Sequence, residues 1–210
     1  TDVDCGAGYC VNEECVDCIT NADCPAGTIC DGNGECISQG YGVVTWGQAY
    51  EGGDSSSVSA QLSSGVSEIF STDVSFAALK VDGSVVTWGS PGYGGSVSSS
   101  VGAQLSSGVT EIFSSSGAFA ALKSDGTVVT WGGSGLGGDS SSVASQLSSI
   151  VQINGNYAAF AALKSDGSVV TWGSQYNGGD SSSVSSQLSS GVSEVYSTYA
   201  AFAALKIDGS

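Results

Sequence analysis

Seven cysteines are the residues with the clearest chemical potential in this sequence of 210 residues. All fall within the first 36 residues, and they are Cys5, Cys10, Cys15, Cys18, Cys24, Cys30 and Cys36. Closely spaced thiols either form disulfides or hold a zinc ion in a tetrahedral site. Only one C-x2-C pair is present and the chain has no His, so a complete zinc site is not expected. Loops this short bury no core, and we predict a disulfide-rich module over residues 1–39.

An odd number of cysteines leaves one thiol over after three disulfides. This thiol is expected to pair with a cysteine upstream of Thr1, to pair with another chain, or to remain free. The lack of an initiating Met and of a signal peptide favours a segment of a longer or processed chain. Disulfides form in oxidising compartments, so we expect a secreted or cell-surface protein. Residues 18–30 resemble the short cysteine-rich repeats of large secreted proteins, in which such a module is usually a spacer.

Carboxylates are the second group with chemical potential. Asp54, Asp139 and Asp180 recur in a Gly-Gly-Asp-Ser-Ser-Ser motif, and carboxylate and carbonyl oxygens are ligands for Ca²⁺. The second unit has Ser96 at this position, and the spacing matches neither an EF-hand nor the nine-residue calcium repeat. We therefore expect these aspartates to cap turns, with calcium binding as the alternative, and predict no other cofactor or metal site.

A second set of aspartates precedes glycine in each unit: Asp82, Asp125, Asp166 and Asp208. Asp-Gly is a strong signal of a β-hairpin turn, so we expect a structural role for this set. In a chain without His, general acid–base catalysis requires paired carboxylates, and a thiol nucleophile lacks its usual base. No catalytic residue is predicted, and the chain is not expected to be an enzyme.

The overall charge excludes two classes of partner. The formal net charge is −16, with 20 acidic residues against 4 basic ones. Phosphate backbones and anionic lipid surfaces repel such a protein, so nucleic-acid binding is not expected. No stretch approaches the ~18 apolar residues of a membrane-spanning helix, so membrane insertion is not expected either. Cations and partners with basic patches are favoured instead.

A repeat positions these residues. Its four tryptophans, Trp46, Trp88, Trp131 and Trp172, are 42, 43 and 41 residues apart. Its four lysines, Lys80, Lys123, Lys164 and Lys206, are 43, 41 and 42 residues apart. Two independent markers keep one period, so the repeat of about 42 residues is secure. Each Lys lies two residues before a turn Asp, where we expect a weak charge pair across the turn or a solvated strand end.

Each unit carries the signals of an antiparallel meander. Residues 109–113, 118–123 and 127–131 are rich in β-branched, aromatic or apolar side chains, and Asp-Gly separates the last two. The Ser-Gln-Leu-Ser-Ser segments are too short to predict a helix. We predict an all-β fold of three- to four-stranded antiparallel blades over residues 40–210. Ala120 and Ala121 allow close approach of the next blade, and Trp131 fills the gap.

The same strings resemble a known family. The pattern from Gly108 to Gly132, which includes Ala-Leu-Lys-Ser-Asp-Gly-Thr-Val-Val-Thr-Trp-Gly, is similar to the RCC1-like repeat in every unit. The resemblance covers about residues 40–210 and implies a β-propeller, usually of seven blades. The short period resembles the secreted bacterial branch, which includes an inhibitor of β-lactamases. Phe119 stands where these repeats often have His, and the acidic charge contradicts chromatin binding of the nuclear branch.

The loops after each Trp-Gly differ between units. They contain Tyr50, Tyr93, Leu136 and Tyr176, which are the candidates for partner binding. Exposed aromatic rings on one face of a propeller form a platform for a protein or a sugar. The alternative is that these side chains fill the gaps between blades.

Candidate assembly edges lie at the two ends of the repeat region. Residues 42–46, which include Val43, Val44 and Trp46, read as a strand after a hairpin turn, whereas Phe202 and Leu205 lie on a strand before such a turn. Each strand lacks its hairpin partner. Three alternatives are open: closure of a four-unit ring, pairing with a second chain in a head-to-tail polymer, or continuation of the chain.

Two functions are consistent with these observations. The first is a non-enzymatic extracellular structural or adhesive protein that self-associates head-to-tail into a fibre or surface layer. The second is a secreted recognition module that binds a protein or glycan on its loop face. Unit-to-unit variation concentrated in one loop favours recognition, and end strands that can pair favour a polymer.

Overall fold

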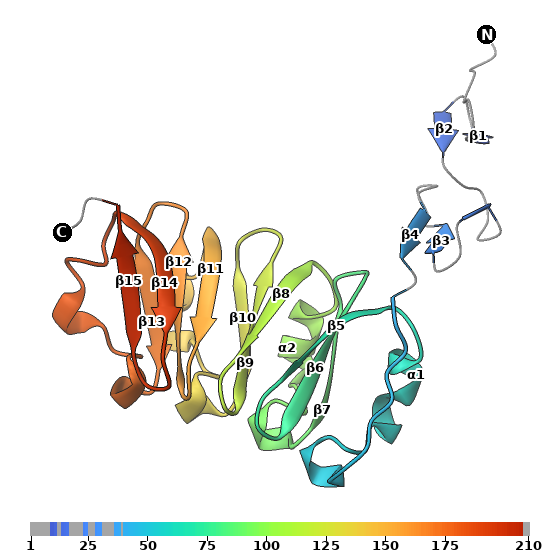
Figure 1. Cartoon of the computed structure of the whole chain (residues 1–210), viewed down its shortest axis with the longest axis horizontal. Coiled ribbons are helices and arrows are strands. Elements are labelled where there is room, and N and C mark those ends of the chain that lie inside the picture. The colour runs from blue at the N-terminus through green and yellow to red at the C-terminus, as the bar shows by residue number, and fades with distance from the viewer. Residues whose placement is uncertain are drawn as a thin grey trace.

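A computed structural model describes residues 9–11, 14–16, 23–24, 28–30, 36–38 and 40–207. From residue 40 onward the chain forms a row of small antiparallel sheets with short helical turns between them (Figure 1). The predicted all-β repeat of antiparallel blades is therefore confirmed. The turn predicted at Asp208 and Gly209 lies outside the described residues.

The described residues of the cysteine-rich module include two short hairpins. Strand β1 (Tyr9–Val11) pairs with β2 (Glu14–Val16), and β3 (Thr28–Cys30) pairs with β4 (Cys36–Ser38). A disulfide joins Cys24 to Cys36, and Cys30 is also disulfide-bonded. The prediction of disulfides is confirmed for these three cysteines. Cys5 and Cys18 lie outside the described residues, and for Cys10 and Cys15 the backbone alone is described.

Residues 40–207 contain three complete blades and one blade of which two strands are described. The first blade contains β5 (Val66–Ser71), β6 (Ser75–Lys80) and β7 (Val85–Gly89), and the second contains β8 (Val109–Ser114), β9 (Ala118–Lys123) and β10 (Val128–Gly132). The third contains β11 (Ile150–Gly155), β12 (Ala159–Lys164) and β13 (Val169–Gly173), and the fourth contains β14 (Val192–Ser197) and β15 (Phe202–Lys206). The second strand is central in every complete blade.

Short helical turns connect the blades. These are η2 (Ala49–Glu51), η3 (Ser56–Val58), α1 (Ser59–Leu62), η4 (Pro91–Tyr93), α2 (Ser99–Gln104), η5 (Ser134–Leu136), η6 (Ser141–Gln146), η7 (Gln175–Asn177) and η8 (Ser182–Val184). The Ala-Gln-Leu segments of the first two units lie in or at the end of α1 and α2, helices that periodicity did not predict, whereas Ser186 to Leu188 of the fourth unit form a non-helical turn. Such short helices gain their stability from tertiary packing, here through the buried side chains of Leu62 and Leu105.

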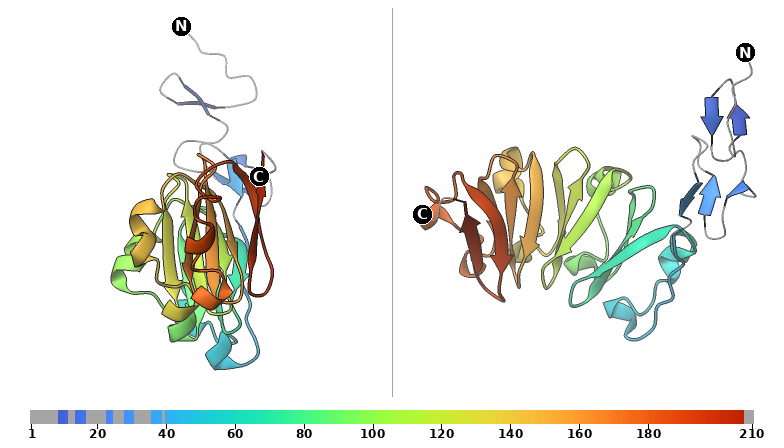
Figure 2. Two further views of the ribbon diagram at one scale, coloured as in Figure 1. Left: turned by 90° about the vertical axis from the view of Figure 1, so that its left-hand side faces the viewer. Right: turned by 45° about the horizontal axis from the view of Figure 1, so that its top comes forward.

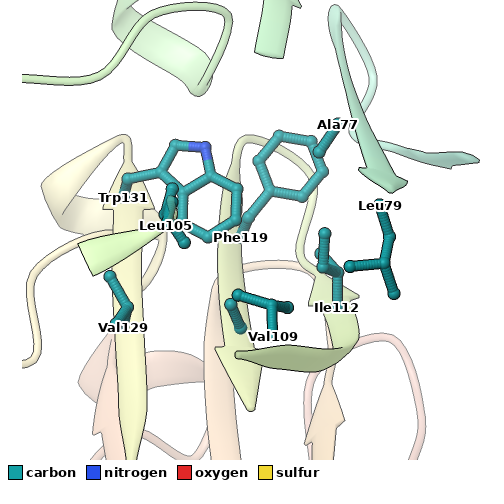
Figure 3. Close-up of a cluster of buried hydrophobic side chains, with 9 residues drawn as sticks. Ala77, Leu79, Leu105, Val109, Ile112, Phe119, Val129 and Trp131 are labelled. Carbon is teal, nitrogen blue, oxygen red and sulfur yellow. The ribbon is translucent and has the colours of Figure 1, made fainter. Parts of the chain in front are cut away.

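The hydrophobic core lies between blades rather than inside any one of them. In the cluster between the first two blades, Ala77 and Leu79 of β6 contact Phe119, Trp131 and their neighbours in the second blade (Figure 3). A three-stranded sheet cannot bury both of its faces alone, so each blade depends on the next one. Ala120 and Ala121 are fully buried and pack in two different clusters, one on each face of β9. The predicted close approach at paired alanines is confirmed.

A contact between Phe, Trp and Gly joins each complete blade to the loop before it. Strand register places Phe119 opposite Trp131, and their rings stack with centroids 5.1 Å apart. The indole Nε1 of Trp131 donates a hydrogen bond to the carbonyl of Gly94, 3.2 Å away, in the preceding loop. Gly94 has a φ of +100°, and a Cβ atom there would lie 2.6 Å from the Phe119 ring. Glycine is therefore required by both backbone conformation and space. We call this arrangement the Phe–Trp–Gly contact.

A ladder of backbone hydrogen bonds also connects successive blades. The turn between the first and second strands of each blade supplies one residue to it. The amide of Asp73 donates to the carbonyl of Ser116, that of Ser116 to Tyr157, and that of Tyr157 to Tyr199. The blades follow one another in an open row, with residues 42–58 at one end and β15 at the other (Figure 2). The ring closure considered from the sequence is therefore not the arrangement of this structure.

The Phe–Trp–Gly contact leads to a first test. We expect Gly94→Ala to lower the free energy of unfolding by about 2–4 kcal/mol. Alanine is strained at the positive φ of this position, and its Cβ would overlap the Phe119 ring. Gly92 lies in the same loop, has no heavy atom within 4 Å of an added Cβ, and serves as the matched control. Urea unfolding of Gly92→Ala is expected to show little change or a slight gain in stability. Equal losses in the two variants would contradict this role of Gly94.

Candidate functional site

Among the described residues, the cluster at the fourth blade has fewer buried members than the clusters at the second and third blades. Its cluster contains Ala161, Leu163, Val192 and Val195, with Leu188 and Phe202 packed against it. These are the repeat equivalents of six residues in the cluster between the first two blades. The equivalents of Val129 and Trp131, both on the third strand of their blade, have no counterpart among the described residues.

A groove of about 510 Å³ lies where this third strand would run. It is bounded by Phe202 to Lys206 along β15, by Leu188, and by Gly178 and its neighbours in the preceding loop. We call it the C-terminal groove. Ala203 and Ala204 are exposed and Leu205 is 53% exposed, whereas the equivalent residues of the complete blades are buried or half-buried. The structure therefore leaves an apolar strand edge uncovered.

The segment that precedes the first blade also exposes apolar side chains. Residues 42–47, which we call the N-terminal segment, carry the third-strand sequence Val-Val-Thr-Trp-Gly but form no strand, because no described strand lies beside them. The expected strand at Val43 and Val44 is therefore wrong for this structure. Trp46 is 83% exposed, whereas Trp88, Trp131 and Trp172 are at most 3% exposed. Val44 is 82% exposed.

The N-terminal segment nevertheless keeps one set of repeat contacts. The amide of Val43 donates to the carbonyl of Leu62 at 2.9 Å, as Val85 does to Leu105 in the next unit. The hydroxyls of Thr45 and Ser55 lie 2.9 Å apart, as those of Thr130 and Ser140 do. The N-terminal segment therefore makes the same hydrogen bonds to the neighbouring helical turns as the third strand of a complete blade does. The five assembly residues predicted from the sequence form two separate surfaces at opposite ends of the row (Figure 1).

The motif aspartates act in turns, as the sequence predicts. The carboxylate of Asp139 accepts a hydrogen bond from the amide of Ser141, and Asp54 and Asp180 make the same contact with their own serines. These bonds lower the pKa of each carboxyl, the backbone amide bond having the largest effect. The unit with Ser96 instead begins the helix α2, whose N-cap is Ser98.

The Asp-Gly turns contain a second hydrogen-bond pattern. The carboxylate of Asp125 accepts bonds from the hydroxyl of Thr127 at 2.6 Å and from its amide at 2.9 Å. The hydroxyl bond is the main cause of the lowered pKa of Asp125, and Lys123 contributes less. Charge pairing across the turn is therefore secondary. The Lys123 Nζ donates instead to the carbonyl of Gln104 at the end of α2, a use of Lys that the sequence did not predict.

The four partner-binding candidates fall into two registers. Tyr93 and Leu136 each lie directly before the Gly-Gly pair, and an added Cβ at Gly117 would contact both. They therefore partly fill the gap between blades. Tyr50 and Tyr176 lie one residue earlier and are 64% and 86% exposed. The four side chains therefore do not occupy one repeat position and do not form a single ring of tyrosines.

Sequence reasoning missed a pair of tyrosines and an amide contact. Tyr157 and Tyr199 stack with ring centroids 4.7 Å apart, both of them exposed, at the same repeat position before Ala-Ala-Phe. The Gln152 side chain, where the other units have Glu, donates to the carbonyl of Val195 and accepts from its amide. A carboxylate could not donate the first bond. Alignment of the repeats reveals both exceptions, but their contacts depend on the stacking of blades.

Among the described residues, no three His, Cys, Asp or Glu side chains are grouped so that they could hold a metal ion. In that same part of the chain, no helix combines the length and apolar character needed to cross a bilayer.

No protein family and no curated protein matches the chain. Among solved structures the chain is similar to human WBSCR16, with a TM-score of 0.36 and 19% sequence identity. The match covers 63% of this chain and 37% of that chain, so the chain spans little more than a third of its length. This similarity carries no conclusion about function, and the blade architecture rests on the strand pairing described above.

The turn hydrogen bonds lead to a pH prediction. An unfolded Asp titrates near pH 3.9, and the pKa of Asp125 is lower in the folded chain. The Asp125 hydrogen bonds therefore stabilise the fold fully above about pH 4, and their contribution is lost as the pH falls through the lowered pKa. Carboxyl ¹³C NMR titration is expected to show this depression, and Thr127→Val is expected to reduce it. An unchanged Asp125 pKa in Thr127→Val would contradict the hydroxyl as the main cause.

Proposed function

We propose that this chain is a non-enzymatic extracellular structural or adhesive protein of RCC1-like repeat type that self-associates head-to-tail. The observation that carries the proposal is the complementarity of its two surfaces. The edge of β15 is exposed from Ala203 to Leu205, and the N-terminal segment exposes Val44 and Trp46. Because the two surfaces lie at opposite ends of the row, their pairing joins one chain to the next.

Two further observations support the extracellular and non-enzymatic parts of the proposal. The Cys24–Cys36 disulfide is typical of oxidising compartments. The chain has no His, and its repeated aspartates are used as turn acceptors. Repeat units without a distinct reactive site suit a building material. The RCC1-like assignment rests on the recurring Ala-Leu-Lys-x-Asp-Gly strings and on the antiparallel blades that they form.

Self-association is tested by light scattering of the full chain over a range of concentrations. We expect the molar mass to rise with concentration, and electron microscopy to show filaments or closed oligomers. Leu205→Lys places a charge on the uncovered edge and is expected to keep the chain at one copy. Val151→Lys is the matched control, because Val151 is 57% exposed on β11 and does not line the C-terminal groove. A wild-type chain that stays at one copy at every concentration would overturn the proposal.

A recognition function is the second candidate, favoured by the exposed tyrosines Tyr50, Tyr157, Tyr176 and Tyr199. Tyrosine supplies both ring area and a hydroxyl to a protein or glycan partner. On this hypothesis Tyr176→Ala is expected to weaken binding in a glycan array or a protein interaction assay by about tenfold or more. Its self-association is expected to remain unchanged, which distinguishes the two functions. Equal binding by wild type and variant would contradict a role for Tyr176.

A further inference from the structure

We propose that a row of side chains on the first strands makes the contacts between neighbouring blades pH-sensitive. The protonated Glu111 carboxyl forms with Ile153 of the next blade the two hydrogen bonds that Gln152 forms with Val195. The row consists of Glu68 on β5, Glu111 on β8 and Gln152 on β11, one residue per blade, and we call it the inter-blade row. Strands β5, β8, β11 and β14 follow one another along the chain of blades (Figure 1). These contacts lie inside one chain and are independent of the proposed self-association.

The contact between the third and fourth blades shows what an amide does at this position. The Gln152 Nε2 donates to the carbonyl of Val195 at 3.0 Å, and the Gln152 Oε1 accepts from the amide of Val195 at 3.3 Å. One neutral side chain thus binds both backbone groups of a residue in the next blade. Backbone groups at such a contact need a partner, and here Gln152 supplies it.

Strand register gives the preceding contact the same geometry. Val195 and Ile153 each lie opposite the second alanine of the Phe-Ala-Ala-Leu sequence in the central strand. Both backbone groups of Val195 bind Gln152, so its antiparallel pair is of the type whose amide and carbonyl point away from the central strand. Ile153 has the same register, so its amide and carbonyl face the second blade. Glu111 there takes the place that Gln152 has in the third blade.

A carboxyl group can reproduce the two bonds only when it is protonated. A carboxylate has no hydrogen to donate, so it cannot bind the carbonyl of Ile153. A neutral carboxylic acid has one donor and one acceptor oxygen, as the end of a Gln side chain has a donor and an acceptor. Among the described residues the Glu111 side chain makes no hydrogen bond, whereas Gln152 makes both bonds to Val195.

The groups around Glu111 favour its neutral form. Partial burial is the main cause of the raised pKa of Glu111, and the like charge of Glu68 on β5 is the second. Strand β11 contains no titratable side chain. Lys80 on β6 and Lys123 on β9 donate instead to backbone carbonyls close to the ends of α1 and α2. Both ammonium groups are therefore used elsewhere.

The raised pKa gives the sign of the pH effect. An unfolded Glu titrates at about pH 4.3, and folded Glu111 holds its proton to a higher pH. The stability that protonated Glu111 contributes is therefore fully present below about pH 4.3 and is lost as the pH rises through the raised pKa. The turn aspartates respond in the opposite sense, because their folded pKa values are lowered.

Exchange of acid and amide at two positions of the inter-blade row tests the inference. Glu111→Gln supplies both hydrogen bonds at every pH. Its urea midpoint is expected to exceed that of wild type by about 0.3–0.5 M at neutral pH and to approach it at about pH 4.5. Gln152→Glu is expected to have a midpoint below that of wild type at neutral pH and to recover it at about pH 4.5. Both side chains occur at this repeat position, so each variant is expected to fold.

Two controls separate hydrogen bonding from loss of charge. Glu51→Gln removes the same charge from an exposed residue of η2, outside the inter-blade row, and is expected to keep the wild-type pH profile. Glu111→Met removes the charge without supplying an amide. Hydrogen exchange of the Ile153 amide at neutral pH is expected to slow about threefold or more in Glu111→Gln but not in Glu111→Met. Equal exchange in these two variants, or a wild-type pH profile in Gln152→Glu, would overturn the inference.

Discussion

The Phe–Trp–Gly contact is the interaction on which the arrangement of blades depends. A Trp on the third strand stacks on a Phe of the central strand, and its indole reaches back to a glycine carbonyl of the preceding loop. The contact buries a large apolar area and satisfies the indole N–H at the same time. It also has no room for any side chain at the glycine. The spacing of about 42 residues between tryptophans is therefore a spacing between blades.

A core that lies between blades has a necessary consequence at the two ends of the row. Each internal sheet contributes one face to the cluster before it and one to the cluster after it, as Ala121 and Ala120 of β9 show. In the part of the chain that the structure describes, the faces at the two ends of the row expose apolar side chains, among them Val44, Trp46 and Leu205. This links the packing of the repeat to the proposed assembly.

The polar side chains described above form hydrogen bonds that stabilise the turns, the loops and the contacts between blades. In the Asp-Gly turns and in the Gly-Gly-Asp loops, the Asp carboxylate accepts a hydrogen bond from the backbone amide two residues later. This bond stabilises the backbone where the next strand or helical turn begins. Lys123 binds the carbonyl at the end of α2 and so connects a strand to the helix before it. The side chain of Gln152 on β11 donates to the carbonyl of Val195 and accepts from its amide, and so connects β11 to β14 of the next blade. The formal net charge of −16 is expected to make copies of the chain repel one another at low ionic strength.

The sequence by itself determined the repeat, the antiparallel hairpins and the two end segments, because strand alternation, Asp-Gly turns and a fixed Trp period are local signals. It also identified Val44, Trp46, Phe202 and Leu205 as members of incomplete hairpins. Only the folded chain shows which of their side chains face solvent and that the two surfaces lie at opposite ends of the row. These depend on how one blade stacks on the next, and stacking brings together residues about 40 positions apart that no local pattern connects.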